Sequence, residues 1–281
     1  NLHELIESEQ ATLLLGVPTV WLGLLNYLDS INAKMHSVNH VVVGGSAAPL
    51  AMVRAFDEKH DAFLIHAWGM TEMSPLGTVN SPTTELMALP KEDRYKRQLK
   101  QGRPIYGVDL KIIDDDGNEL PRDGKAYGRL LVRGPWITSG YYKSEDRSAF
   151  VDGWFDTGDV ATLDSLNTMQ IVDRRKDVIK SGGEWISSID LENIAVGHQA
   201  VKEACVIGVP HPKWDERPIL LVVLKDGASA TKEDIITYVS QHIAKFWTPD
   251  DVIFVPDLPH TATGKLHKVP LREKFANHLM V

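Results

Sequence analysis

The sequence contains a single cysteine, Cys205, among 281 residues. One cysteine cannot form an internal disulfide or a cysteine-rich zinc site, and this scarcity is typical of a reducing compartment. Basic residues are also in the minority, because 30 lysines and arginines stand against 38 aspartates and glutamates, for a formal net charge of −8. That balance provides no basic surface for nucleic acid or for an anionic membrane. We therefore expect a cytoplasmic protein whose ligands are small molecules.

Long apolar runs are absent as well. The most apolar stretch, residues 11–28, contains Pro18 and several polar residues and has no basic flank. It therefore indicates a core segment rather than a signal peptide or a transmembrane segment. The signatures of phosphate loops, dinucleotide folds, zinc proteases and serine hydrolases are missing too. The chain begins at Asn1, without a methionine and in the middle of a pattern, which indicates a processed or truncated part of a longer protein.

The remaining composition is that of an ordinary globular protein, with 43% apolar and 24% charged residues. Helix and strand signals alternate over the first 63 residues. Helices are predicted at residues 21–28 and 50–59, and short apolar strands at residues 40–45 and 63–67. This alternation is typical of an α/β fold, in which helical crossovers join parallel strands.

Strands dominate the middle of the chain, and the last third is mixed. The polar segment 81–101 is predicted to run over the surface. Strands and turn signals between residues 108 and 172 predict an antiparallel barrel or sandwich. Capping signals at Ser187 and Thr231 then begin two helices among three strands. We expect a large domain over residues 1–175, with an α/β sheet to about residue 90 and a β-barrel over about 100–172. A small mobile α+β domain follows over residues 176–281.

Two motifs follow predicted buried strands in the first part. Residues 44–49 are small and end in proline, so that a flat ring or a phosphate can approach the backbone closely. Considered alone, a plain strand-to-helix turn is the simpler explanation of this motif. Residues 68–72, Trp-Gly-Met-Thr-Glu, combine an aromatic face, a hydroxyl that can donate to a phosphate and a carboxylate that can bind Mg²⁺. Considered alone, Glu72 also fits an ordinary surface carboxylate.

Three further motifs lie later in the chain. Asp159 ends the run Trp-Phe-Asp-Thr-Gly-Asp just before a predicted strand, where a carboxylate is suited to accepting both hydroxyls of a ribose, although an Asx turn also explains the run. The glycine pair at residues 182–183 beside Lys180 fits a hairpin equally well. Lys265 lies in a polar loop, where a lysine is usually solvated. Each motif is ambiguous alone, and their order is more informative.

The motifs read, in order, GGSAAP, WGMTE, GRLLVRGPWITSGYY, WFDTGD, DRRKDVIKSGGEWIS and PHTATGK. This series resembles the adenylate-forming superfamily, which includes acyl-CoA synthetases, adenylation domains of nonribosomal peptide synthesis and firefly luciferase. Residues 134–142 and 180–192 are most similar to fatty acyl-CoA synthetases. The resemblance covers the whole chain and implies an acyl-CoA synthetase-like fold, with ATP or AMP, Mg²⁺ and coenzyme A as ligands.

The chain departs from the family pattern in two respects. Members carry a Ser/Thr/Gly-rich loop, ending in a lysine, that wraps the β- and γ-phosphates, and this sequence contains no such loop. The chain therefore looks like the C-terminal half of a synthetase, with the N-terminal part missing. Trp68 stands where the family usually has tyrosine, which preserves an aromatic face for the adenine but removes the phenol.

The resemblance implies roles for matching residues of the large domain. Ser46, Ala47 and Ala48 would lie along the adenine, and Trp68 would stack on it. The nucleotide-binding motif continues through Gly69, Met70 and Thr71, and Thr71 would contact the α-phosphate. Glu72 would hold magnesium, and Asp159 would accept the ribose hydroxyls.

It implies roles for residues near and within the small domain too. Arg174 would assist Asp159, and Lys176 would be the hinge about which the small domain turns. Lys265 would contact the carboxylate and the α-phosphate during adenylation. The Gly182-Gly183 turn would enter the site for thioester formation. Lys265, Thr71 and Glu72 are thus the expected catalytic residues.

The expected function is that of an ATP-dependent fatty acyl-CoA synthetase for medium- or long-chain acids, inactive as this fragment alone. One alternative is an adenylating ligase for another acid, such as a short thioether or aryl carboxylate. Another is a nucleotide-binding fragment without catalysis. A homodimer is left open by the sequence.

Overall fold

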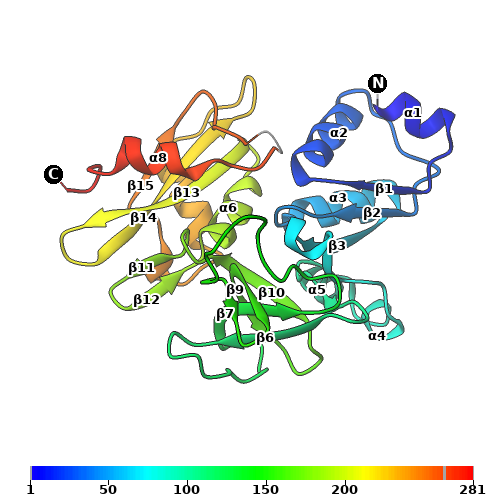
Figure 1. The fold of residues 1–281 in the computed structure, drawn as a ribbon. Helices are drawn as coiled ribbons and strands as arrows, with labels where there is room; N and C mark the ends of the chain where they lie inside the picture. The colour runs from blue at the N-terminus through cyan, green and yellow to red at the C-terminus, as the bar shows by residue number, and fades with distance from the viewer. Residues whose placement is uncertain (1, 262–263, 281) are drawn as a thin grey trace. The chain divides into compact units, whose positions relative to one another are not determined.

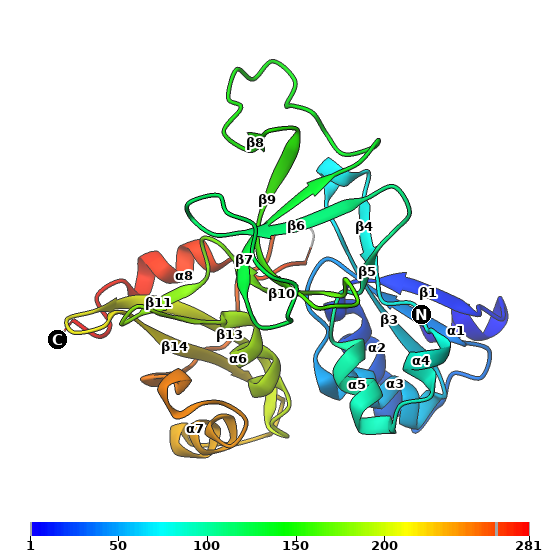
Figure 2. The same ribbon diagram turned by 90° about the horizontal axis from the view of Figure 1, so that it is seen from below.

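The computed structural model describes residues 2–261 and 264–280. The chain forms two compact units, residues 1–172 and residues 173–281, and each is described by itself (Figures 1 and 2). No helix in the described ranges is both long and apolar enough to cross a membrane.

A five-stranded sheet with the order β1-β2-β3-β4-β5 organises the first part of unit 1. Strands β1 to β3 are parallel, whereas β4 and β5 are added antiparallel. The helices and strands predicted up to residue 67 are all present. The elements are α1 (Leu2–Ser8), β1 (Leu13–Gly16), α2 (Pro18–Ser30), β2 (His40–Val43), α3 (Leu50–His60), β3 (Phe63–Gly69), the 3₁₀ turn η1 (Thr71–Met73), β4 (Leu76–Val79) and β5 (Arg103–Pro104).

Helices α2 and α3 pack on one face of this sheet. Alternate strand residues, such as Leu14, Val41 and Leu64, are buried with the apolar sides of both helices in one core. Parallel strands need such crossover helices, because the chain must return along a face of the sheet before the next strand begins. This packing fixes the carboxyl ends of β2 and β3, which carry the first two motifs.

The segment predicted to run over the surface contains two helices, α4 (Thr84–Met87) and α5 (Lys91–Gln98). Helix α5 is strongly polar, yet Tyr95 and Gln98 are almost completely buried. Tyr95 Oη donates to Asp57 at 2.6 Å, and Gln98 Nε2 donates to the Leu64 carbonyl at 2.9 Å. Most residues of the segment are not buried, which agrees with a surface location, while one aromatic ring and long-range hydrogen bonds anchor α5 in place of an apolar stripe.

A second sheet of unit 1 has the strand order β10-β9-β7-β6, with β8 paired to β9. Strand β7 pairs antiparallel with both β6 and β9, as predicted for this part of the chain, and the end strands β6 and β10 share no ladder in the described ranges. Met169 of β10 instead bridges to Gly102, beside β5. The strands are β6 (Asp109–Ile113), β7 (Tyr127–Arg133), β8 (Phe150–Val151), β9 (Trp154–Leu163) and β10 (Met169–Arg174).

Unit 2 is built on a sheet of order β12-β11-β14-β13, with β15 parallel to β14. Alternation along β13 places Ala204 and Val206 in a core with α6 and α7, and Cys205 and Ile207 in a second core with α8. Figure 2 shows α7 and α8 on opposite faces of the sheet. The elements are β11 (Ile179–Ser181), β12 (Glu184–Ile186), α6 (Ser188–Val196), β13 (Val201–His211), β14 (Asp215–Leu224), α7 (Lys232–Ser240), η2 (Lys245–Trp247), β15 (Asp251–Phe254) and α8 (Lys268–Phe275).

The predicted helix starts of unit 2 are confirmed. Ser187 caps α6 by accepting from the Asp190 backbone N–H at 3.1 Å. Thr231 and Asp234 form a complete capping box at the start of α7. Each cap satisfies a backbone donor that has no partner within the helix.

Candidate nucleotide site

The loop after β3 is held in a tight path. Gly69 is required there, because a Cβ atom at this position would lie 1.9 Å from the Pro75 carbonyl oxygen. Beyond Met70, the turn η1 carries Thr71 and Glu72 at an accessible position. The loop after β2, which carries the other glycine motif, leaves the same edge of the sheet, since β2 and β3 are parallel and paired from His40–Phe63 to Val43–His66. Ligands of open α/β sheets bind at this carboxyl edge.

Trp68, at the end of β3, contacts Asp159 directly. The indole Nε1 donates to Asp159 Oδ2 at 2.9 Å. Both side chains are nearly enclosed, since Trp68 is 9% and Asp159 3% exposed. The structure thus brings together two motif residues that lie 91 positions apart. No local pattern in the sequence indicates this bond, because the family resemblance implies only a stacking role for the ring.

Asp159 lies at an irregularity inside β9. Residues Arg129 and Leu131 of β7 pair with Val160 and Asp156, so the β9 segment 157–159 bulges opposite Leu130. Thr157 Oγ1 supports the bulge by accepting from the Asp159 backbone N–H at 3.1 Å. Bulges of this kind re-aim a side chain and occur next to active sites. The expectation of a carboxylate just before a strand is corrected to a carboxylate at a bulge within one.

Glu72, the expected magnesium ligand, is held from the second sheet's connecting loop. Tyr141 Oη donates to Glu72 Oε1 at 3.0 Å, and the Thr138 backbone N–H donates to the Glu72 carbonyl at 2.8 Å. Partial burial, and then the neighbouring Glu72 carboxylate, raise the pKa of Tyr141 above its usual value. Tyr141 was part of a motif in the sequence, but only the structure shows that it positions Glu72.

The side chains around Glu72 fit a metal ion that arrives with a substrate better than a metal ion held by protein ligands alone. In residues 2–261 and 264–280, no group of three His, Cys, Asp or Glu side chains could hold an ion. Mg²⁺ is usually bound through one or two carboxylates together with substrate phosphates and water. Glu72, half-buried and held by Tyr141, fits the role of such a single carboxylate.

The glycine-rich loop after β2 turns through Gly45, whose φ of 81° places it in the left-handed region. Ser46 is exposed and Ala47 half-buried, whereas the Ala48 side chain is buried in the core under α3. Only the backbone of Ala48 can therefore face a ligand. Beside this loop, His66 of β3 pairs with Val43 at the end of β2, and its ring Nδ1 lies 3.0 Å from the Leu99 carbonyl oxygen.

His66 should make the stability of unit 1 sensitive to acid. Burial lowers the pKa of His66 from 6.5 to about 4. The unfolded chain takes up this proton near pH 6.5, but the folded chain does so only near pH 4. The contribution of the neutral His66 ring to the free energy of unfolding is therefore complete above pH 6.5. It is lost on acidification through this window, by about 3 kcal/mol.

We expect His66→Gln to remove this part of the pH dependence. The measurement is the free energy of unfolding between pH 4 and 7.5, compared with that of the wild-type chain. His36→Gln, at an exposed position, serves as the matched control and should leave the curve unchanged. Equal slopes for His66→Gln and the wild type would contradict the assignment.

Arg174 and Lys176 lie at the start of unit 2, next to a buried ionic cluster. Ser188 donates through its N–H and Oγ to Asp173 Oδ2 at 2.7 and 2.6 Å, and Lys268 Nζ lies 2.7 Å from Glu192 Oε1. Burial alone would lower the pKa of Lys268, but Glu192 and Asp173 raise it above its ordinary value. The cluster ties Asp173 to α6 and α8, while Lys176 is exposed in the turn that follows.

The Gly182-Gly183 pair is the turn of the β11–β12 hairpin, in which Ser181 pairs with Glu184. Both glycines have positive φ, 58° and 85°, as a type I′ turn requires. Gly182 packs under Trp214, whereas a Cβ on Gly183 would meet nothing within 4 Å. The alternative prediction of a hairpin is thus correct for the local structure. The open side of Gly183 leaves space for a ligand.

Lys265 closes a turn that begins at Thr261. The Thr261 N–H donates to the Lys265 carbonyl at 2.8 Å, and the Lys265 N–H donates to Thr261 Oγ1 at 3.2 Å. Residues 262 and 263 of the motif lie outside the described residues. Within the described ranges, the Lys265 ammonium group has no hydrogen bond or ion pair with the protein, so the backbone is fixed while the charge stays available.

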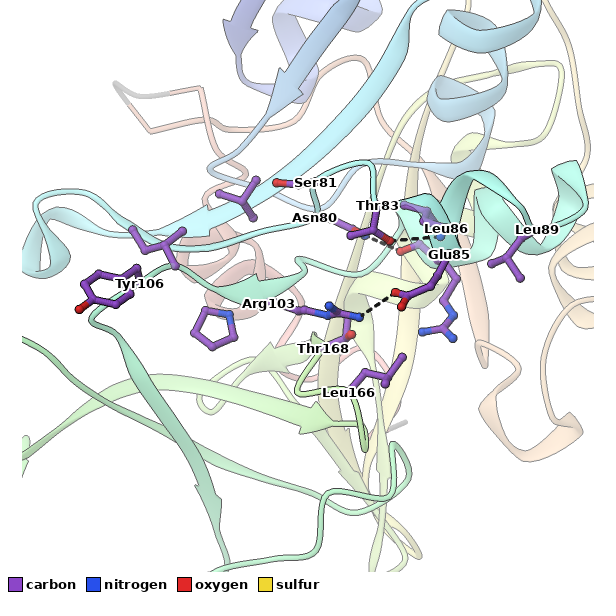
Figure 3. Close-up of a pocket in the computed structure, with 14 residues that line it drawn as sticks. Asn80, Ser81, Thr83, Glu85, Leu86, Leu89, Arg103, Tyr106, Leu166 and Thr168 are labelled. Carbon is purple, nitrogen blue, oxygen red and sulfur yellow. Dashed lines mark hydrogen bonds and ion pairs between the residues drawn. The ribbon is translucent and has the colours of Figure 1, made fainter.

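A cavity of about 410 Å³ lies elsewhere in unit 1, between α4, α5 and β5 (Figure 3). None of the motif residues lines it. Its two arginines have carboxylate partners, since Arg103 lies 3.8 Å from Glu85 and Arg97 3.7 Å from Asp164. The described lining therefore offers no unpaired cation to phosphates, and the cavity is separate from the motif site.

Comparison with known proteins supports the family resemblance along the whole chain. Residues 1–142 match the family model "AMP-binding enzyme", and residues 190–265 match "AMP-binding enzyme C-terminal domain". The chain is 50% identical to the 3-methylmercaptopropionyl-CoA ligase of Ruegeria lacuscaerulensis, over 99% of this chain and 52% of that protein. It is 46% identical to the medium-chain-fatty-acid–CoA ligase of Ectopseudomonas oleovorans, over 100% of this chain and 51% of that protein.

A solved structure of the anthranilate CoA ligase AuaEII, in complex with anthranoyl-AMP, matches with a TM-score of 0.87 and 26% identity. The match covers 100% of this chain and 53% of that one. Fold and motifs together define a chain of the adenylate-forming class, which confirms the predicted fold class and resemblance. The chain belongs to the AMP-binding enzyme family. It spans about half the length of the curated relatives it matches.

Proposed function

We propose that this chain is the nucleotide-binding and mobile part of an AMP-forming acid–CoA ligase. The observation that carries the proposal is the convergence of Trp68, Asp159 and Glu72 around the carboxyl edge of the first sheet, in a member of the AMP-binding family. Asp159 would accept the ribose hydroxyls, Ser46 and Ala47 would border the adenine, and Thr71 would contact the α-phosphate.

The chemistry explains why these residue types are needed. A carboxylate oxygen attacks the α-phosphorus of ATP, pyrophosphate leaves, and the resulting acyl-AMP then loses AMP to the thiol of coenzyme A. The first step joins two anions, so positive charge beside the phosphate lowers the barrier. Lys265 would supply such a charge, and Mg²⁺ held by Glu72 would supply another. Tyr141 would fix the Glu72 carboxylate in place.

Coenzyme A must reach the same carbonyl in the second step. A lysine that fills the opening blocks the thiol, so the two steps require different faces of unit 2. Lys265 would serve adenylation, the Gly182-Gly183 turn would serve thioester formation, and Lys176 would be the pivot. Arg174, at the start of unit 2, would join the ribose contacts in one of these states.

The acid is proposed to be aliphatic, because the relatives compared include ligases for a thioether acid and for medium-chain fatty acids. A methylthio group resembles two methylene groups in size, so one apolar tunnel can accept both kinds of acid. The thioether acid, at first an alternative to a fatty acid, gains support from the identity of 50% against 46%.

The acid can be identified in a completed enzyme, in which the amino-terminal half of the Ruegeria lacuscaerulensis relative precedes this chain. Pyrophosphate exchange would be measured with 3-methylmercaptopropionate, straight-chain acids of increasing length and benzoate. We expect pyrophosphate exchange with the aliphatic acids. Exchange with benzoate alone would contradict the aliphatic assignment.

The 281-residue chain itself should bind AMP weakly and fail to adenylate. The reason is that contacts for adenine, ribose and α-phosphate are present, whereas the sequence lacks the loop with which the family holds the β- and γ-phosphates. Titration calorimetry with AMP and a pyrophosphate-exchange assay check both parts. Robust ATP-dependent acyl-CoA formation by this chain alone would contradict the prediction, and absence of AMP binding would contradict the nucleotide site.

A further inference from the structure

Trp68 differs in its environment from a ring that offers a face to a base. It belongs to the core of the second sheet and is 9% exposed. Its ring occupies space that Gly77 leaves empty, because a Cβ at Gly77 would lie 2.7 Å from Cζ3 of Trp68. Little of the indole is therefore open to a ligand, while its N–H is fully used.

That N–H donates to Asp159, the residue proposed to accept the ribose hydroxyls. The backbone on both sides of the bond is irregular. The β3–β4 register shifts between Trp68 and Gly69, and the β7–β9 register shifts opposite segment 157–159. The two bulges bring the indole of one sheet to the carboxylate of the other.

Each hydrogen bond that a carboxylate accepts restricts the rotation of its side chain. A hydrogen bond from a buried, rigid indole orients one carboxylate oxygen, and a charged acceptor makes such a bond stronger than a neutral one. The donor also stabilises the negative charge of Asp159, which is only 3% exposed.

We infer that Trp68 is a positioning residue, which orients the Asp159 carboxylate toward the ribose through its indole N–H. This inference rests on the proposed role of Asp159, and it assigns to Trp68 a task that a stacking ring alone does not perform. Discrimination between ribose and deoxyribose nucleotides is then set partly by a residue that does not itself touch the hydroxyls.

The test compares AMP with 2′-deoxy-AMP on the 281-residue chain by titration calorimetry. The wild type should prefer AMP. Trp68→Phe retains an aromatic ring but removes the donor, so its AMP affinity should fall about tenfold while its affinity for 2′-deoxy-AMP changes little. The ratio of the two affinities is the decisive readout, because general loosening of the core would weaken both nucleotides alike.

Trp136→Phe is the matched control. Trp136 packs against the same core, and its indole donates to the Leu76 carbonyl at 3.4 Å rather than to Asp159. This variant should leave the ratio unchanged. A Trp68→Phe, Asp159→Asn double-mutant cycle should show that the two effects are not additive.

A measurement on the wild-type chain tests the same role without depending on the folding of Trp68→Phe. The indole ¹⁵N–¹H signal of Trp68 should move more with AMP than with 2′-deoxy-AMP, and it should be displaced in Asp159→Asn. If the wild type prefers AMP but Trp68→Phe keeps the same preference, or the indole signal does not respond, the positioning role is wrong and the nucleotide site stands. If the wild type shows no preference for AMP, the ribose role of Asp159 fails as well.

Discussion

Lys265→Ala is expected to lose pyrophosphate exchange by about 10²–10³-fold in the completed enzyme, the scale of removing one charge-stabilising donor. It should still convert a supplied acyl-adenylate and coenzyme A to the thioester. The reason is that Lys265 would neutralise charge only while the carboxylate approaches the α-phosphate. Its backbone is fixed by Thr261, so loss of the side chain should not disturb the turn. Lys274→Ala, an exposed lysine of the same unit, is the control and should retain both half-reactions.

Gly183→Leu should have the opposite effect. A branched side chain on the open side of the turn would obstruct the thiol while leaving the ATP contacts intact. The φ of 85° at Gly183 adds strain for any L-residue, so Gly183→Asn, which tolerates this conformation with a smaller side chain, controls for strain. Each half-reaction is assayed separately for each variant. Equal loss of both half-reactions in Lys265→Ala and Gly183→Leu would refute the two-faced mechanism.

Asp159→Ala should weaken ATP about 10²-fold or more in the same enzyme and affect the acid little. Two charge-assisted hydrogen bonds to the ribose would be lost, each contributing about 1.5–3 kcal/mol. The alanine variant also leaves the Trp68 indole without its partner, whereas Asp159→Asn retains an acceptor for it. Asparagine should therefore weaken ATP while preserving thermal stability better than alanine. Calorimetry that gives an unchanged ATP affinity for both variants would exclude Asp159 from the ribose site.

Local sequence patterns predicted most of the secondary structure. The apolar periods of the first 67 residues predicted α2, α3, β2 and β3 correctly but not α1 and β1, and the capping signals at Ser187 and Thr231 predicted the right helix starts. These features involve residues within a few positions of one another, so the information lies within the segment itself. Helix α5 escaped prediction, because Tyr95 and Gln98 are held by partners more than thirty residues away.

The sequence by itself determined the family, the motif loops and their order along the chain, because glycines, caps and alternating apolar residues act locally. Only the tertiary structure decided how the site is held together. The Trp68–Asp159 bond, the Tyr141–Glu72 bond and the contact of His66 with the Leu99 carbonyl each join separate elements. Such contacts depend on the register of each strand pair and on the bulges beside Trp68 and Asp159. A register shift of one residue moves every side chain of a strand to the opposite face of its sheet. Local patterns do not determine these registers, so packing between distant segments had to fix them.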